Sequence, residues 1–245
     1  MSKLNERKQN ILQAIIQDYL ATAEPVGSRY ISRRYKLGVS PATIRNEMAD
    51  LEEEGYIKQP YTSAGRIPSD KGYRYYVDNL MKTKHLTQRE ESLIKNAYKQ
   101  KSHDTDIIAH QTLTTISFLS RYAAIMMITK GESKYQVYHY GISNIASQPE
   151  FNNISHLKHF AKIFEEEDLL SSILREYSIE DGVAIKIGSE NKFKEIKEYS
   201  VVATSYGTRD RKPGSIGIIG PTRMFYNKAA SIVEYIAQEL SDFIS

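Results

Sequence analysis

The stretch Val39-Ser40-Pro41-Ala42-Thr43-Ile44-Arg45-Asn46-Glu47-Met48-Ala49-Asp50-Leu51 is the most informative part of this 245-residue chain. It predicts a helix that begins after Ser40, because serine is a good N-cap and proline suits the first helical position. Ile44, Met48 and Leu51 recur at i, i+4 and i+7, so one stripe of this helix should be buried. The opposite stripe is small and polar. It suits either an ordinary solvent-facing helix or a helix that enters a DNA major groove by its N-terminal end.

Composition narrows the class of protein. With 40% hydrophobic and 26% charged residues, the chain is typical of a globular protein of one large or two ordinary domains. The net charge of +3 is small, so a nucleic-acid surface would have to be a local patch. Because there is no cysteine, disulfides, thiolate metal sites and cysteine nucleophiles are excluded. The first residues lack the apolar core of a secretion signal and no long uncharged run follows, so we expect a cytoplasmic protein without membrane spans.

The residues before this stretch predict two more helices. Asn5 can cap a first helix with an apolar face, which Glu24-Pro25-Val26-Gly27 should break. Ser28 is expected to cap a short second helix over residues 29–35, and a tight turn then leads to Ser40. This order is that of a helix-turn-helix in which the last helix reads DNA.

Residues 56–68 predict a β-hairpin, because two short extended runs flank a tip of small residues. Taken by itself the segment would be a plain surface turn. Directly after a reader helix, however, such a hairpin is a wing. Arg66 and the hydroxyl groups of Thr62 and Ser63 would then meet DNA phosphates.

Charge is unevenly distributed in this region. Acidic residues concentrate in the C-terminal half of the expected reader helix, whereas its approach carries Arg29, Arg33, Arg34 and Lys36. Together with the positive end of the helix dipole, this distribution should direct DNA toward the N-terminus of the reader helix.

The second half of the chain predicts an α+β domain after a polar linker. The run 135–145 is ambiguous in secondary structure. The other expected elements are helices over 104–120, 154–164, 167–177 and 224–243, and strands over 123–128, 183–187, 200–206 and 215–219.

No motif supports catalysis. His156 and His159 lie one turn apart, but a metal site would need a third oriented ligand, and a chance surface pair is more frequent in a chain with six histidines. Gly214, Gly217 and Gly220 do not match the dinucleotide-binding pattern and are interpreted as turns at strand edges. We therefore expect neither an enzyme, nor a cofactor, nor a bound metal.

Several strings of residues resemble one family, the bacterial heat-inducible transcription repressor HrcA. The strings are long and occur in the family's order at both ends of the chain. They are residues 5–8, 19–28, 39–48, 59–74, 187–191, 200–202 and 217–224.

The resemblance implies a winged-helix domain over residues 1–81, a linker and connecting helix over 82–103, and a GAF-like α+β domain over 104–245. It also implies repression of chaperone operons by a homodimer that binds an inverted-repeat operator in double-stranded DNA, assisted by a GroEL-type chaperonin. The candidate DNA-binding residues are Arg29, Arg33, Ser40, Ala42, Thr43, Arg45, Asn46, Tyr61, Thr62, Ser63 and Arg66.

Within that set the geometry of a helix predicts different roles. Asn46 lies opposite the apolar stripe, so Asn46 and Thr43 are expected to read base edges. Arg45 flanks the stripe, so Arg45 and Arg66 are expected mainly to hold phosphates.

The chain departs from the family in length. Family members are longer, and the shortfall falls between Ile128 and about Gln148, where they have further strands and an inserted dimerisation domain. We therefore expect a truncated sheet that leaves apolar surface exposed on residues 125–128, and heat that acts through the second half of the chain. Two alternatives remain open: a winged-helix regulator whose GAF-like domain senses a small molecule, and an inert truncated relative.

Overall fold

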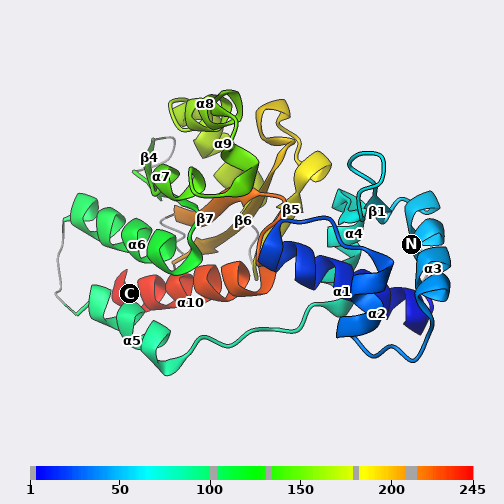
Figure 1. Cartoon of the computed structure of the whole chain (residues 1–245). Helices are drawn as coiled ribbons and strands as arrows, with labels where there is room; N and C mark the ends of the chain where they lie inside the picture. The colour runs from blue at the N-terminus through cyan, green and yellow to red at the C-terminus, as the bar shows by residue number, and fades with distance from the viewer. Residues whose placement is uncertain (1–3, 100–103, 131–133, 179–181, 208–213, 245) are drawn as a thin grey trace. The chain divides into compact units, whose positions relative to one another are not determined.

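The computed structural model describes residues 4–99, 104–130, 134–178, 182–207 and 214–244. The chain divides into two compact units, Met1–Lys82 and Thr83–Ser245 (Figure 1). The division falls at the polar stretch that was predicted as a linker.

The first unit consists of helices and one small antiparallel sheet. The caps of its first and third helices are confirmed, since Asn5 Oδ1 accepts a hydrogen bond from the Lys8 N–H at 2.8 Å and Ser40 Oγ accepts one from the Thr43 N–H at 3.1 Å. The elements are α1 (Glu6–Thr22), α2 (Ser28–Arg34), α3 (Pro41–Glu53), β1 (Ile57–Lys58), β2 (Ile67–Pro68), α4 (Asp70–Tyr75) and a π-helical turn (Tyr76–Leu80).

The start of α2 corrects one prediction. Gly27 has extended backbone angles and occupies the N-cap position, so Ser28 is the first helical residue and not the cap. The helix gains no side-chain cap there, because glycine offers no acceptor.

The buried stripe of α3 is confirmed. Ile44, Met48 and Leu51 are at most 5% exposed, in the same core as the apolar face of α1. Val26, between α1 and α2, adds a third extended segment to the hairpin: its N–H and C=O both pair with the backbone of Arg66 at 2.9 Å. A Cβ on Gly65 would lie 2.5 Å from the Val26 carbonyl carbon, so only glycine permits this approach.

The second unit is built on a five-stranded antiparallel sheet with the order β4-β3-β7-β6-β5. Its register pairs Ala123 with Ile219 and Ala124 with Tyr140. The strands are β3 (Ala123–Thr129), β4 (Tyr135–Tyr140), β5 (Ala184–Ile187), β6 (Tyr199–Tyr206) and β7 (Gly214–Pro221). The helices are α5 (Gln88–Ala97), α6 (Thr105–Ser120), α7 (Ile142–Ile145), α8 (Ile154–Ile163), α9 (Glu167–Tyr177) and α10 (Tyr226–Ile244), with short 3₁₀ turns at Pro149–Phe151, Gly188–Glu190 and Lys194–Ile196.

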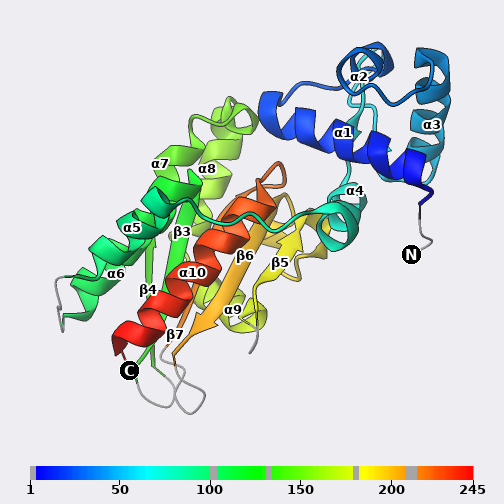
Figure 2. The same ribbon diagram turned by 90° about the horizontal axis from the view of Figure 1, so that it is seen from below.

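Helices cover both faces of this sheet. α5, α6 and α10 lie on one face, and α8 and α9 on the other (Figure 2). Beneath α8, Phe160 packs against Phe151, Phe164 and Tyr199 with ring centroids 4.9–5.1 Å apart. This aromatic cluster forms a core on the α8 side of the sheet.

The expected exposed surface on residues 125–128 is not found at the first three of them, and Ile128 is half-buried. Ile125, Met126 and Met127 are at most 4% exposed, because β3 lies between β4 and β7 rather than at an edge. The ambiguous run after residue 135 is the reason: Tyr135–Tyr140 forms a strand that covers β3.

The interpretation of the glycines as turns is also wrong. Gly214, Gly217 and Gly220 lie within β7, the central strand of the sheet. A Cβ on Gly214 would lie 1.9 Å from the Met127 carbonyl oxygen, so at that position glycine allows the strands to pack closely. In the described ranges no helix is both long and apolar enough to cross a membrane.

Candidate nucleic-acid interface

A groove of about 560 Å³ lies in the first unit, where the start of α2, one side of α3 and the hairpin converge. It brings together four predicted residues: Arg29, Arg45, Ser63 and Arg66. Its full lining is Gly27, Ser28, Arg29, Arg45, Met48, Gln59, Ser63, Ala64, Gly65 and Arg66.

The outer face of α3 carries the predicted reading residues. Ala42, Arg45 and Asn46 are exposed, whereas Thr43 is half-buried. The Thr43 hydroxyl lies 2.9 Å from Ser40 Oγ, so these two side chains hydrogen-bond to each other as well as capping the helix. The alanine leaves room for another molecule to approach the N-terminal end of the helix closely.

Two acidic residues of α3, and Glu54 just after it, form ion pairs with cations of α1. Arg7 Nη1 lies 3.1 Å from Glu47, and Lys8 Nζ lies 3.2 Å from Asp50 and 2.6 Å from Glu54. The hydrogen bond to Glu54 raises the pKa of Lys8 above its ordinary value. The cations of the first helix are therefore engaged within the unit.

A carboxylate on α3 also holds the hairpin. Glu52 Oε1 accepts a hydrogen bond from the Gln59 N–H at 3.1 Å, and Glu52 Oε2 accepts one from Arg66 Nε at 2.8 Å. Because Gln59 and Arg66 lie on opposite arms of the hairpin, a single side chain ties both arms to α3. The structure thus places Arg66 directly before β2, where the hairpin loop ends, ion-paired with Glu52 and not at the tip as predicted.

The sequence did not indicate the roles of Glu52, Gln59 or Val26. Glu52 lies 14 positions from Arg66, and no local spacing rule links two residues at that distance across a turn. The glycine at position 65 was the one available signal, because glycine inside an extended run often marks a close backbone approach.

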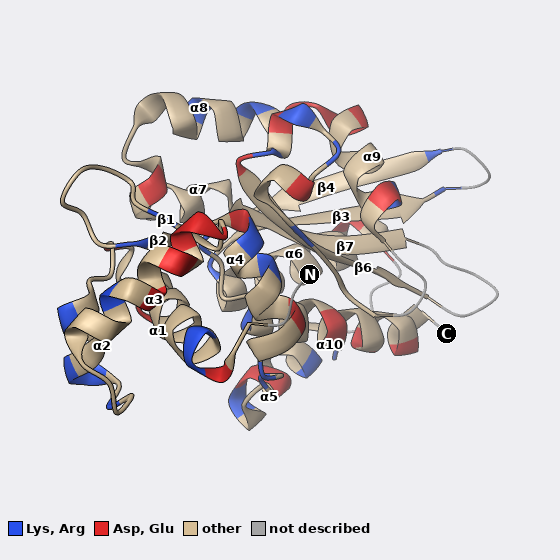
Figure 3. Ribbon diagram, turned by 90° about the vertical axis from the view of Figure 1, so that its right-hand side faces the viewer, with Lys and Arg blue, Asp and Glu red and all other residues tan. Residues whose placement is uncertain are grey.

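Three of the predicted arginines have no carboxylate partner among the described residues. In the part of the chain that the structure describes, Arg29, Arg33 and Arg45 form no ion pair, and all three are exposed. Arg34, by contrast, lies 3.2 Å from the buried carboxylate of Asp18. Figure 3 shows the resulting distribution, with basic residues on α2 and acidic residues on α3.

The tip of the hairpin is strongly exposed. Tyr61 is 66% exposed, and Thr62 and Ser63 also face solvent. The Ala64 N–H donates to the Tyr61 carbonyl oxygen at 3.0 Å, which closes the turn. The tip residues therefore project from a defined turn.

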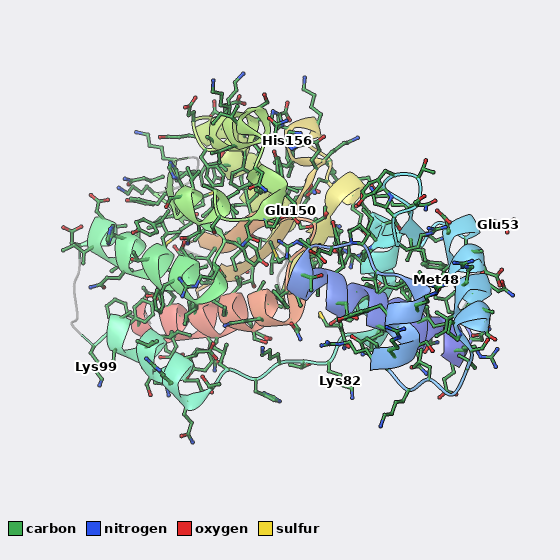
Figure 4. All side chains as sticks on the ribbon, viewed as in Figure 1. Met48, Glu53, Lys82, Lys99, Glu150 and His156 are labelled. Atoms are coloured by element: carbon green, nitrogen blue, oxygen red, sulfur yellow. The ribbon has the colours of Figure 1, made fainter. Side chains whose placement is uncertain are left out.

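Burial along α3 separates its inner and outer sides. Met48 is 5% exposed, whereas Glu53, near the end of the helix, faces solvent (Figure 4). The outer side of the helix thus changes from neutral and basic at its start to acidic at its end.

The histidines of α8 each lie near a backbone carbonyl oxygen. His156, which is labelled with Glu150 in Figure 4, has its Nδ1 3.4 Å from the Glu150 carbonyl oxygen. His159 Nε2 lies 3.2 Å from the Glu195 carbonyl oxygen. Over the described ranges, no group of three or more His, Cys, Asp or Glu side chains is arranged to hold a metal ion.

Comparison with known proteins identifies the family. Residues 71–230 match the family model described as the HrcA protein C terminal domain. The chain is 35% identical to the heat-inducible transcription repressor HrcA of Pelotomaculum thermopropionicum, over 99% of this chain and 97% of that relative. The chain belongs to the HrcA family.

Other HrcA proteins match in the same way. The chain is 35% identical to the heat-inducible transcription repressor HrcA of Desulforamulus reducens, over 98% of this chain and 96% of that relative. The alignment to the Pelotomaculum protein spans 338 positions, whereas this chain has 245 residues, so at least 93 positions lie opposite gaps in this chain. The Pelotomaculum relative therefore has internal residues that this chain lacks.

A solved structure shares the fold. A crystal structure described as that of a hypothetical protein superposes with a TM-score of 0.74 over 98% of both chains, at 18% identity. At that identity the likeness concerns the fold alone.

Proposed function

We propose that this chain is a cytoplasmic, heat-inducible transcription repressor that binds operator DNA through its first unit, as a winged helix-turn-helix. The observation that carries the proposal is the surface of that unit. Arg29, Arg33 and Arg45 are exposed beside a groove between α2, α3 and the hairpin, and none of them has a carboxylate partner within the described ranges. Exposed arginines beside the N-terminal end of a capped helix suit a phosphate backbone. The names of the HrcA relatives agree with this role.

In this proposal α3 is the reader helix. Asn46 would form hydrogen bonds with base edges, because it is exposed on the side opposite Ile44 and Met48. Thr43 would contribute its methyl group and hydroxyl, held by Ser40. Ala42 lies close to them and would allow close approach to a base.

The remaining candidate residues would hold the DNA backbone. Arg29 and Arg33 lie one turn apart on α2 and would contact phosphates on one side of the groove, with Arg45 on the other. The hairpin would act as the wing, with Tyr61, Thr62 and Ser63 at the contacting tip. Arg66 would act mainly by orienting the wing, because Glu52 engages its guanidinium group.

For the second unit we propose a GAF-like domain, shortened relative to other HrcA proteins, which supports a homodimer on an inverted-repeat operator. We also propose that a GroEL-type chaperonin binds the heat-loosened form of this unit. The buried β3 strand becomes accessible to a chaperonin only after the sheet opens. A chaperonin that bound the fully folded chain as well as the heated chain would contradict this part.

Fluorescence anisotropy with an inverted-repeat DNA from upstream of a chaperone operon tests the central proposal. A scrambled duplex of the same length and base composition is the control, and both are measured at several stated salt concentrations. We expect the inverted repeat to bind at least about 1,000-fold more tightly than the scrambled duplex. Equal affinity for the two duplexes would contradict the proposed role.

The same assay, combined with thermal unfolding, distinguishes the repressor from a small-molecule sensor. A metabolite that raises the unfolding free energy by more than about 2 kcal/mol at saturation, and that changes operator affinity, would favour a sensor. The repressor proposal expects operator affinity to fall on warming in the absence of any such ligand.

A further inference from the structure

A buried carboxylate of α1 lies against α2, the helix that carries Arg29 and Arg33. Asp18 is 4% exposed, and its Oδ1 lies 3.2 Å from Arg34 Nε. The Tyr30 hydroxyl donates a long hydrogen bond of 3.5 Å to the same oxygen. Asp18 Oδ2 is also buried, and it accepts no hydrogen bond from the described residues. Because a buried carboxylate is costly unless a cation compensates it, Asp18 holds Arg34 firmly in place.

Two tyrosines of the same segment lie near this ion pair. The Arg34 guanidinium carbon lies 5.9 Å from the centroid of the Tyr30 ring. Tyr35 is half-buried, and burial together with the negative charge of Asp18 raises the pKa of its hydroxyl. Tyr35 therefore stays neutral, and Arg34 is the group that compensates the charge of Asp18. The surroundings of Arg34 thus restrict the positions that its side chain can take.

The outer part of Arg34 remains open to solvent. Arg34 contacts Asp18 through Nε, and its side chain is 60% exposed. Arg66 differs, since both its Nε and its Nη2 lie against Glu52 and its side chain is 21% exposed. A guanidinium group carries five N–H donors in a planar fork, of which Nε supplies one. The terminal nitrogens of Arg34 can therefore bind a second anion while Nε stays on Asp18.

Arg34 also belongs to the surface that we propose for DNA binding. It follows Arg33 directly on α2, and both side chains are exposed. Basic residues gather on this helix (Figure 3). Residues 35–40 then lead to the N-terminal end of α3, the proposed reader helix. In a helix-turn-helix the helix before the reader crosses the DNA backbone, so a phosphate near Arg33 would also be near Arg34.

We infer that Arg34 is a further phosphate-binding residue of the repressor and that the buried Asp18 is its positioning residue. Asp18 holds Nε, which fixes the plane of the guanidinium group and leaves the terminal nitrogens for one phosphate of the DNA backbone. A side chain that is already ordered loses less conformational freedom on binding. This inference rests on the proposed DNA-binding function, and it adds a residue whose ion pair would otherwise exclude it as a DNA ligand.

The sign of the effect of Asp18→Asn distinguishes positioning from neutralisation. The substitution keeps the shape of the side chain and removes one negative charge, which by itself favours DNA binding. If Asp18 positions Arg34, the affinity for the inverted repeat should instead fall about two- to tenfold. If Asp18 only neutralises Arg34, the affinity should rise. Glu24→Gln is the control, because it removes the same charge at an exposed residue just beyond α1 and should not weaken binding.

A double variant tests the phosphate contact itself. Arg34→Gln alone would leave Asp18 without its cation, so it is combined with Asp18→Asn. Relative to Asp18→Asn, the double variant should bind DNA about eightfold more weakly at 0.1 M salt and reduce the salt slope by about 0.9, as expected for one phosphate. Fluorescence anisotropy should show an equal loss on the inverted repeat and on the scrambled duplex, because phosphate contacts carry no sequence information.

Melting curves establish whether each variant is folded. If Asp18→Asn does not fold, Arg34→Lys decides instead. Lysine keeps the charge, but a compact ammonium group cannot hold Asp18 and a phosphate on opposite sides of a planar fork. The affinity of Arg34→Lys should therefore fall at least about threefold.

Three results would overturn the inference. They are an Asp18→Asn variant that binds DNA at least as tightly as the wild type, a double variant with the salt slope of Asp18→Asn, and an Arg34→Lys variant with wild-type affinity. A wild-type chain that bound the inverted repeat and the scrambled duplex equally would contradict the operator role. The salt slopes would still decide whether Arg34 contacts a phosphate, so the two failures can be told apart.

Discussion

Three exposed arginines of the first unit contrast with one buried arginine of the second. In the first unit Arg29, Arg33 and Arg45 are exposed and have no carboxylate partner among the described residues. In the second unit Arg223 is 7% exposed, with its Nε 2.5 Å from Glu150 Oε1 and its Nη2 2.9 Å from Gln148 Oε1. Exposed, unmatched charge serves a partner from outside, whereas buried, matched charge holds the chain's own segments together.

The units also differ in the range of their contacts. The longest-range backbone pairing described in the first unit joins Val26 to Arg66, whereas the central strand pairing of the second unit joins Ala123 to Ile219. Long-range strand pairs depend on the whole sheet being intact. We therefore propose that warming loosens the second unit first, and the predictions below test that contrast and the role of the first unit.

The largest effect is expected in the aromatic core of the second unit. Phe160→Ala should lower the unfolding free energy by about 3–5 kcal/mol, because the ring is fully buried against Phe151, Phe164 and Tyr199. The melting temperature from calorimetry and the temperature at which operator binding is lost should both fall. Ile154→Ala, at a 62% exposed site on the same helix, is the control. Operator binding that persists above the melting temperature of the second unit would contradict the proposal that heat acts through this unit.

The next largest effect concerns the free arginines of the first unit. Replacing Arg29, Arg33 and Arg45 together with alanine should weaken DNA binding about 500-fold at 0.1 M salt and reduce the salt slope by about 2.7, if each contacts one phosphate. The melting temperature should barely change, because none of the three forms an ion pair in the part of the chain that the structure describes. Arg7→Ala is the matched control, since that cation pairs with Glu47. An equal loss of DNA affinity in Arg7→Ala would mean that affinity depends on net charge alone.

Asn46→Ala should cost about 1–3 kcal/mol for the inverted repeat and little for scrambled DNA, because a lost base-edge contact affects specificity. Competition binding with single-base variants of the repeat would locate the position that Asn46 reads. Ala49→Ser, on the same outer side, is a control with similar exposure. If Asn46→Ala weakened both duplexes equally, the residue would contact the DNA backbone instead.

A smaller effect of about 1 kcal/mol or less is expected at the partly exposed ion pair of Glu52 with Arg66. Glu52→Gln keeps an acceptor for the Gln59 N–H but releases the charge of Arg66. If Arg66 lies near a phosphate, the salt slope should increase by about 0.9. An unchanged slope, measured over the same salt series, would place Arg66 away from the DNA.

The smallest effect is expected at the start of α5. Hydrogen bonds from Thr87, together with Lys228, lower the pKa of Glu90 to about 2. A carboxyl group whose pKa falls on folding stabilises the folded state above its unfolded pKa and loses that contribution as the pH falls toward 2. Glu90→Gln should therefore lower stability slightly at pH 7 and flatten the pH dependence below about pH 4.5 in melting experiments. If stability changed with pH in Glu90→Gln as it does in the wild type, the stabilising role of the Glu90 carboxylate would be contradicted.

Local chemistry explains what could be predicted from the sequence. The N-caps at Asn5 and Ser40 and the buried stripe of α3 depend on residues within two turns of one another, so spacing rules apply. The resemblance to HrcA, carried by strings at both ends of the chain, is confirmed by the family match. The exposure of Asn46 and Arg45 follows from the same helical periodicity.

Only the tertiary structure decided which charges remain available and where the sheet ends. Glu52 contacts Arg66 because the hairpin turn folds back, and Ala123 pairs with Ile219 because the sheet assembles. Each contact joins residues far apart in the sequence, so spacing rules cannot predict it. For the same reason the glycines of β7 could be taken for turns, and the run that forms β4 remained ambiguous from sequence. A strand is stabilised by its neighbours, and its neighbours are chosen when the whole chain folds.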